Sequence, residues 1–112
     1  MRFAGKIAAQ CGHATLACYK ALLKASQKKP NGPEATLLRQ WERHGQAKIA
    51  VQIKSQDEML EIMGTAHSLG VTAEVIADAG RTQIESGSLT VLGVGPAPKS
   101  QVDKITGHLK LL

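Results

Sequence analysis

One stretch decides the fold of this chain: GKIAAQCGHATLACYKALLKAS, residues 5–26. An α-helix turns by about 100° per residue, which collects the apolar residues of this stretch in one sector. The basic and polar residues fall in a second sector, whose centre lies roughly 125° from the first. The stretch therefore predicts a helix with a core-facing side and a basic side. The core-facing residues are Ile7, Cys11, Ala14, Cys18, Leu22 and Ala25, and the basic side holds Lys6, Gln10, His13, Lys20 and Lys24.

The basic side of this helix has two interpretations. Lys20 and Lys24 fit an ordinary solvated surface, because exposed lysines are common. Lys6, Gln10 and His13 lie at the amino-terminal end, where free backbone N–H groups also favour anions. These three residues are therefore the better candidates for binding or chemistry.

Helices and strands alternate along the rest of the chain. Turn, capping and hydrophobic patterns predict helices over 34–44, from 55–57 to 69, and over 100–105, and strands over 48–53, 72–77 and 89–95. This order favours an α/β fold, a single domain with a mixed sheet and helices packed on both of its faces. Helical crossovers favour parallel strand pairs, and we expect the last two strands to be antiparallel.

Composition limits the classes of protein that this chain can belong to. Its 112 residues fit one domain, and a formal net charge of +5 suits an anionic partner. No apolar run approaches the ~18 residues that a membrane-spanning helix needs, and no signal peptide is visible. We therefore expect a soluble, cytoplasmic protein.

The two cysteines predict neither a disulfide nor a metal site. Cys11 and Cys18 are two helical turns apart, so their Cα atoms are separated by about 10.5 Å, whereas a disulfide needs less than about 7 Å. This spacing argues against a thiol redox protein. Neither cysteine has metal-ligand spacing to any of the four histidines, His13, His44, His67 and His108. Gly93-Val94-Gly95-Pro96 lacks the third glycine of a dinucleotide loop, so no cofactor is expected.

Asp78 directly follows a predicted strand and precedes a glycine turn. Ligands of α/β sheets usually sit outside the carboxyl ends of strands, and the hydroxyls of Thr82 and Thr90 flank the same turn. An aspartate that only forms the turn, and a solvated Arg81, are the competing interpretations. The residues alone therefore indicate a small basic α/β domain that binds an anion.

Three segments resemble one family, the archaeal and eukaryotic type of peptidyl-tRNA hydrolase, which is the second peptidyl-tRNA hydrolase family. They are GKIAAQCGHA at 5–14, DAGRTQI at 78–84 with GSLTVLGVGP at 87–96, and VDKITGHLKL at 102–111. The segments WE at 41–42 and GQAK at 45–48 also match. The resemblance covers nearly the whole chain in the family's order.

The resemblance implies hydrolysis of the ester that joins a peptide to the terminal ribose of tRNA, without a metal or another cofactor. It also implies a four-stranded mixed sheet, of which three strands are visible here, and a homodimer. A catalytically weak RNA- or protein-binding module of the same fold is the alternative function. Association with mitochondria is expected only if a membrane anchor lies upstream.

The resemblance further implies the site. Lys6, Gln10, His13, Asp78, Thr82 and Thr90 stand where the family's proposed active-site residues stand. Asp78 is the candidate for activating water, Lys6 for stabilising the oxyanion, and the two threonines for orienting water or substrate. His13 is equally compatible with a structural role. Candidates for contacts with tRNA phosphates are Lys20, Lys24, Arg81, Lys104 and Lys110.

The chain departs from the family at its start. The family's domain opens with an apolar strand just before the Gly-Lys helix, and this chain begins at Met1, after that strand. We therefore expect residues 1–112 to form a peptidyl-tRNA hydrolase-like domain that lacks the first strand, with an exposed sheet edge.

Overall fold

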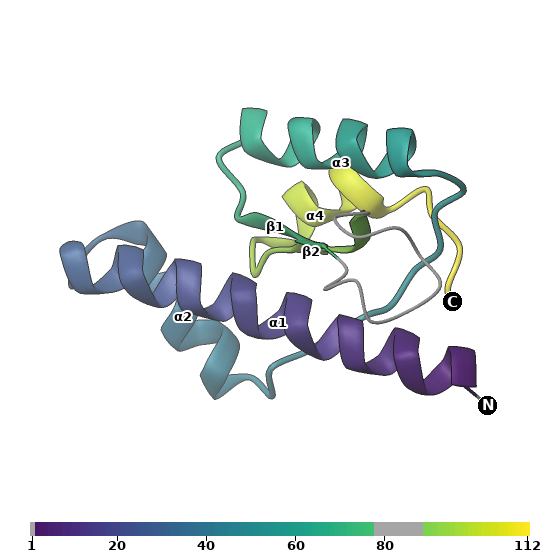
Figure 1. The fold of residues 1–112 in the computed structure, drawn as a ribbon. Coiled ribbons are helices and arrows are strands. Elements are labelled where there is room, and N and C mark those ends of the chain that lie inside the picture. The colour runs from purple at the N-terminus through teal and green to yellow at the C-terminus, as the bar shows by residue number, and fades with distance from the viewer. Residues whose placement is uncertain (1, 78–88) are drawn as a thin grey trace.

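The computed structural model describes residues 2–77 and 89–112. In chain order, the elements are α1 (Arg2–Lys28), α2 (Pro33–Arg43), α3 (Gln56–Ser68), β1 (Ala73–Ala77), β2 (Leu89–Val94) and α4 (Lys99–Thr106). They form three layers: α1, with α2 packed on it, covers one side of the strand pair, and α3 with α4 covers the other (Figure 1). The predicted α/β class, with helices on both faces of the sheet, is confirmed.

Local signals fix the ends of the helices close to the predicted positions. Proline at the first position of α2 suits a helix start, and α2 ends just before Gly45, whose φ is +95°. The side chain of Ser55 accepts a hydrogen bond of 3.1 Å from the backbone N–H of Glu58 and so caps α3. The first helix extends three residues further toward the amino terminus than its periodicity predicts, to Arg2.

The two strands pair in antiparallel fashion, as the sequence predicts. Ala73 lies opposite Val94, and the register shifts between Ile76 and Ala77. Because Ile76 pairs with Val91 and Ala77 pairs with Leu89, one residue of β2 has no partner. The strand pair therefore contains a β-bulge at Thr90.

The prediction of a third strand over 48–53 is wrong for the part of the chain that the structure describes. This segment makes one isolated bridge, between Val51 and Leu111, supported by a hydrogen bond of 2.9 Å from the Gln52 N–H to the Lys110 carbonyl. The described sheet has two strands and no parallel pair. A β-branched composition favours a strand only where a neighbouring strand completes the hydrogen-bonded ladder.

An aromatic contact joins α2 to α1 and to the segment that follows α2. The indole N–H of Trp41 donates a hydrogen bond of 3.0 Å to the Ala47 carbonyl, and the Lys48 ammonium lies 5.5 Å from the centre of the indole ring. The ring of Tyr19 on α1 lies 6.3 Å from that of Trp41, and its hydroxyl donates to the Glu42 carboxylate. These contacts fix where the chain leaves α2.

The core consists of small and medium aliphatic side chains, as the low aromatic content predicts. Its largest cluster lies between the strands, α3 and α4, and the buried residues opposite it come from α1 and α2. The cluster contains Ile62, Ala66, Val71, Ala73 and Ile105, and the buried residues of the other side are Ala14, Cys18, Leu22, Ala35 and Leu38.

A glycine in β2 allows α1 to lie directly on the sheet. A Cβ atom at Gly93 would stand 2.7 Å from the sulfur of Cys18 and 3.0 Å from the backbone oxygen of Ala14. Both distances are shorter than van der Waals contact, so only glycine fits without a shift of the helix. Gly93 therefore sets the separation between α1 and β2.

The same contact buries the thiol of Cys18. Cys18 is 5% exposed, and both cysteines are free, which confirms the expectation that they form no disulfide. Burial raises the pKa of the Cys18 thiol to about 11, and the nearby Glu74 carboxylate contributes to the rise. Cys11 is only half-buried, so the two thiols differ in accessibility.

We predict that Gly93→Ala destabilises the protein. The added methyl group must push α1 away from the sheet, at a cost of ~1–3 kcal/mol in the free energy of unfolding, measured by urea denaturation. Gly64→Ala in α3 is the matched control, because its Cβ would meet no atom within 4 Å. Unchanged unfolding of Gly93→Ala would show that this contact does not limit the packing of α1.

We also predict that the two cysteines react at different rates. At pH 8 a thiol of pKa about 11 holds about one part in a thousand as the reactive thiolate. A thiol-specific chromogenic reagent should therefore modify Cys11 in the native protein and Cys18 only after unfolding in urea. Rapid modification of both thiols in the native state would contradict the burial of Cys18, and Cys11→Ser identifies the reacting residue.

Candidate active site

Three of the predicted site residues lie together on α1. Lys6, Gln10 and His13 occupy successive turns, about 6 Å and 4.5 Å apart along the helix axis. Lys6 and Gln10 are half-buried, and His13 is exposed. The three side chains therefore lie on one helix, in its amino-terminal half.

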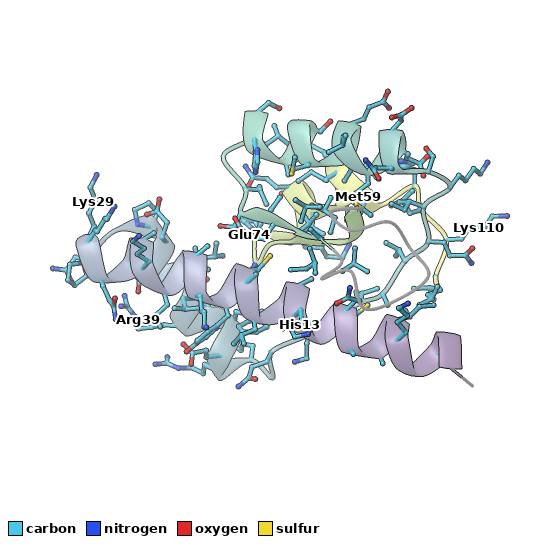
Figure 2. All side chains as sticks on the ribbon, viewed as in Figure 1. His13, Lys29, Arg39, Met59, Glu74 and Lys110 are labelled. Carbon is cyan, nitrogen blue, oxygen red and sulfur yellow. The ribbon has the colours of Figure 1, made fainter. Side chains whose placement is uncertain are left out.

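The contact between α1 and β2 determines how these side chains lie around the helix. Ala14 is buried against the sheet, and Gln10 lies one turn earlier, about 40° away around the axis. His13 lies about 100° from Ala14, further toward solvent, near the middle of α1 in Figure 2. Gln10 thus lies beside the face of α1 that contacts the sheet, whereas Lys6 and His13 lie further from that face around the helix axis.

The strands end near this half of α1. Gly93 rests on α1 at Ala14 and Cys18, and Leu89 starts β2 four residues earlier, roughly 13 Å along the strand. Figure 1 shows that β1 runs toward the side on which the amino-terminal half of α1 lies, and its last residue, Ala77, pairs with Leu89. A ligand at Lys6 and Gln10 therefore lies on the same side of the molecule as these strand ends.

The remaining predicted site residues are not tested by this structure. Asp78, Arg81 and Thr82 lie outside the described residues. Only the backbone of Thr90 is described, and Thr90 is the extra residue of the bulge in β2. Bulges are common beside active sites, where they redirect the strand.

The predicted phosphate contacts are distributed over more than one layer. Lys20 and Lys24 are exposed on α1, whereas Lys104 is exposed on α4 across the strand pair. Lys110 is exposed next to the carboxyl terminus, which lies at the same end of the molecule as the amino terminus of α1 (Figures 1 and 2). Lys110 thus lies at the amino-terminal end of α1, and the other three lysines lie further along α1 or in another layer.

Two further observations concern the described residues as a set. Within residues 2–77 and 89–112, no group of three His, Cys, Asp or Glu side chains could hold a metal ion. In this part of the chain, no helix combines the length and the apolar character needed to cross a membrane.

One positioning residue is missed by the sequence reasoning. The sequence pattern gives Gly93 no packing role, although Gly93 determines where α1, and with it Lys6 and Gln10, lies against the sheet. The available signal is a glycine inside a predicted strand, which often marks a place where another backbone approaches closely.

Comparison with known proteins identifies the family. The family model described as peptidyl-tRNA hydrolase PTH2 matches residues 2–112. The chain is 53% identical over 107 residues to a "Probable peptidyl-tRNA hydrolase 2" of Schizosaccharomyces pombe, covering 96% of this chain and 48% of that protein. It is 46% identical to the "Peptidyl-tRNA hydrolase 2, mitochondrial" of Mus musculus over 96% of this chain and 55% of that protein.

An archaeal relative is matched over most of its own length. The "Peptidyl-tRNA hydrolase" of Methanocaldococcus jannaschii is 43% identical over 108 residues, which cover 96% of this chain and 87% of that protein. The chain spans about half the length of the two eukaryotic relatives. Because the family model and the alignments with these relatives cover almost the whole chain, the chain belongs to the peptidyl-tRNA hydrolase PTH2 family.

Proposed function

We propose that this protein hydrolyses the ester bond between peptide and tRNA in peptidyl-tRNA, releasing free tRNA and peptide. The observation that carries this proposal is the family match over residues 2–112. It is supported by the accessible group of Lys6, Gln10 and His13 at one end of α1. Residues 1–112 act in this proposal as one catalytic domain.

Ester hydrolysis sets three requirements, and the proposed site assigns residues to the first two. It needs an activated water, a donor for the developing oxyanion and a proton for the leaving ribose oxygen. The Lys6 ammonium supplies positive charge for the oxyanion, and Asp78 activates or positions the water. Thr82 and Thr90 orient the water or the substrate.

Gln10 and His13 complete the site as residues that position the substrate. Gln10 lies on the flank of α1 next to the sheet, where its amide can donate to a carbonyl oxygen and accept from an N–H group. His13 is exposed one turn further on, so it contacts the substrate from the solvent side. Both residues act in this proposal on the part of the substrate that adjoins the ester.

Binding of tRNA rests on positive charge. Phosphate contacts by lysine and arginine contribute affinity without reading base sequence, which suits an enzyme that accepts many tRNAs. The proposed contacts are Lys20, Lys24, Arg81, Lys104 and Lys110. The chain's net charge of +5 agrees with this class of partner.

We further propose a cytoplasmic homodimer. Two free thiols suit a reducing compartment. Among the described residues, the most exposed large apolar side chains are Ile49, Leu111 and Leu112, at 77%, 70% and 64%. The two segments that carry them lie side by side, because Val51 bridges Leu111 and the Leu112 N–H donates to the Ala50 carbonyl. Contact with a second copy would remove this apolar surface from water.

We predict that Asp78→Ala lowers the rate constant for hydrolysis of N-acetyl-aminoacyl-tRNA by about 10²–10³-fold, because the water loses its activating carboxylate. The affinity for uncharged tRNA, measured by fluorescence anisotropy, should stay the same. Glu61→Ala on the exposed part of α3 removes the same charge elsewhere and is the control. Unchanged turnover of Asp78→Ala would remove this residue from the mechanism.

The same assay tests the function itself. Folded wild-type protein should release tRNA well above the background rate of ester hydrolysis. No release above background, together with preserved binding of tRNA, would replace the enzyme by an RNA-binding module.

We predict that Leu111→Glu shifts the protein from dimer to monomer, since a charge in the apolar contact must be desolvated on association. Sedimentation equilibrium measures the mass of the particle. Leu60→Glu on α3, which is 38% exposed, is the control for a surface charge. A wild-type protein that sediments as a monomer would contradict the dimer, and an unaffected dimer of Leu111→Glu would place the contact elsewhere.

A further inference from the structure

The positive charge of this protein is concentrated in one helix. The 27 residues of α1 contain five of the fourteen lysines and arginines and none of the nine aspartates and glutamates. The rest of the chain therefore carries nine charges of each sign. The whole formal net charge of +5 resides in α1.

The lysines of α1 form a row that runs along the molecule. Lys6, Lys20 and Lys24 share one sector of the helix, and Lys28 lies about 50° from that sector's centre. Lys20, Lys24 and Lys28 are all exposed. The row from Lys6 to Lys28 spans about 33 Å. It covers most of the longest dimension of the described molecule, which is 45 Å.

The packing of the fold leaves this row open to a partner. The strands cover the side of α1 that carries Ala14 and Cys18, and α2 packs on another side. Helix α3, which contains Asp57, Glu58 and Glu61, lies in the opposite layer (Figure 1). The positive charge of the row on α1 therefore attracts a polyanion.

Distance along α1 separates the row into two parts. Lys6 belongs to the proposed ester site, whereas Lys20 lies about 21 Å away from it along the axis and Lys28 about 33 Å. A single nucleotide attached to the ester does not reach that far. Lys20, Lys24 and Lys28 span about 12 Å, which accommodates several successive phosphates of one nucleic-acid strand at about 3.4 Å each.

We infer that Lys20, Lys24 and Lys28 bind backbone phosphates in the stem of the tRNA, so that the protein selects peptidyl esters carried on a stem over those on short 3′ fragments. This inference rests on the proposed function, because it places the ester at the Lys6 end of α1. The three lysines contribute binding affinity for the stem. A short 3′ fragment does not extend from the ester site to these lysines, and the protein therefore prefers substrates with a stem. The contacts depend on the presence of a stem and not on its base sequence.

The experiment compares two substrates that carry the same N-acetyl-aminoacyl ester. One is a minihelix of acceptor stem and CCA end, and the other is the CCA trinucleotide alone. Lys20→Ala/Lys24→Ala/Lys28→Ala is tested against Lys29→Ala/Lys54→Ala/Lys99→Ala, which removes the same charge from exposed positions outside α1. Both kcat/KM and the dissociation constant of the unacylated minihelix are measured at several salt concentrations, and circular dichroism checks the fold.

The row variant should lose at least about tenfold in kcat/KM on the minihelix and nothing on the trinucleotide. The slope of log affinity against log salt should fall by about one for each lysine removed, and the control variant should change neither quantity appreciably. Equal losses on both substrates would show that the row acts at the ester. An unchanged minihelix affinity would show that the row is a solvated surface.

A failure of the proposed function gives a different result. In that case wild type cleaves neither substrate, and binding of the unacylated minihelix still tests the row. Weaker binding by the row variant than by the control would then retain the stem-binding surface, and equal binding by the two variants would exclude it.

Discussion

The close contact between α1 and β2 is the constraint on which the rest of the structure depends. Gly93 lies under Ala14 and Cys18 so tightly that no side chain larger than a hydrogen atom fits between helix and strand. Burial of Cys18 follows from this contact, as does the position of every other residue of α1 relative to the sheet. One glycine in a short strand therefore determines where both the candidate active site and the basic row lie.

This contact also separates structural from functional residues along α1. The residues facing the sheet are small or aliphatic, and the polar residues lie on the remaining surface, with Gln10 at the boundary. The strands end on the amino-terminal side of the contact, toward Lys6 and Gln10 (Figure 1). Chemistry proposed for residues 5–14 and phosphate binding proposed for residues 20–28 are thus placed on opposite sides of the same contact.

Most elements can be predicted from the sequence because their signals are local. Pro33, Gly45 and Ser55 bound α2 and α3 through backbone preferences and a side-chain cap, and the structure contains those features. The strand prediction for residues 48–53 is wrong, because their composition suits a strand but, in the described part of the chain, no neighbouring strand completes a ladder with them. Here they make a single bridge to Leu111, near the carboxyl terminus.

Likewise, one part of the candidate site can be predicted from the sequence, and the other part depends on tertiary packing. Helical spacing is enough to place Lys6, Gln10 and His13 together, because the distances between them depend on one helix alone. Their relation to Asp78, Thr82 and Thr90 depends on tertiary packing and stays a prediction. The packing role of Gly93 depends on its approach to α1, and a pattern search for nucleotide loops does not detect this role.

The location of the Gly93 contact has a mechanical consequence. Ala14 and Cys18 lie at the middle of a helix that runs without interruption from Arg2 to Lys28. The carboxyl-terminal arm of α1 is also held by α2, where the rings of Tyr19 and Trp41 lie 6.3 Å apart. A tilt of α1 about the Gly93 contact would therefore move that arm against α2. With an arm of about 20 Å, a tilt of about 5° would displace the end of the helix by about 1.7 Å.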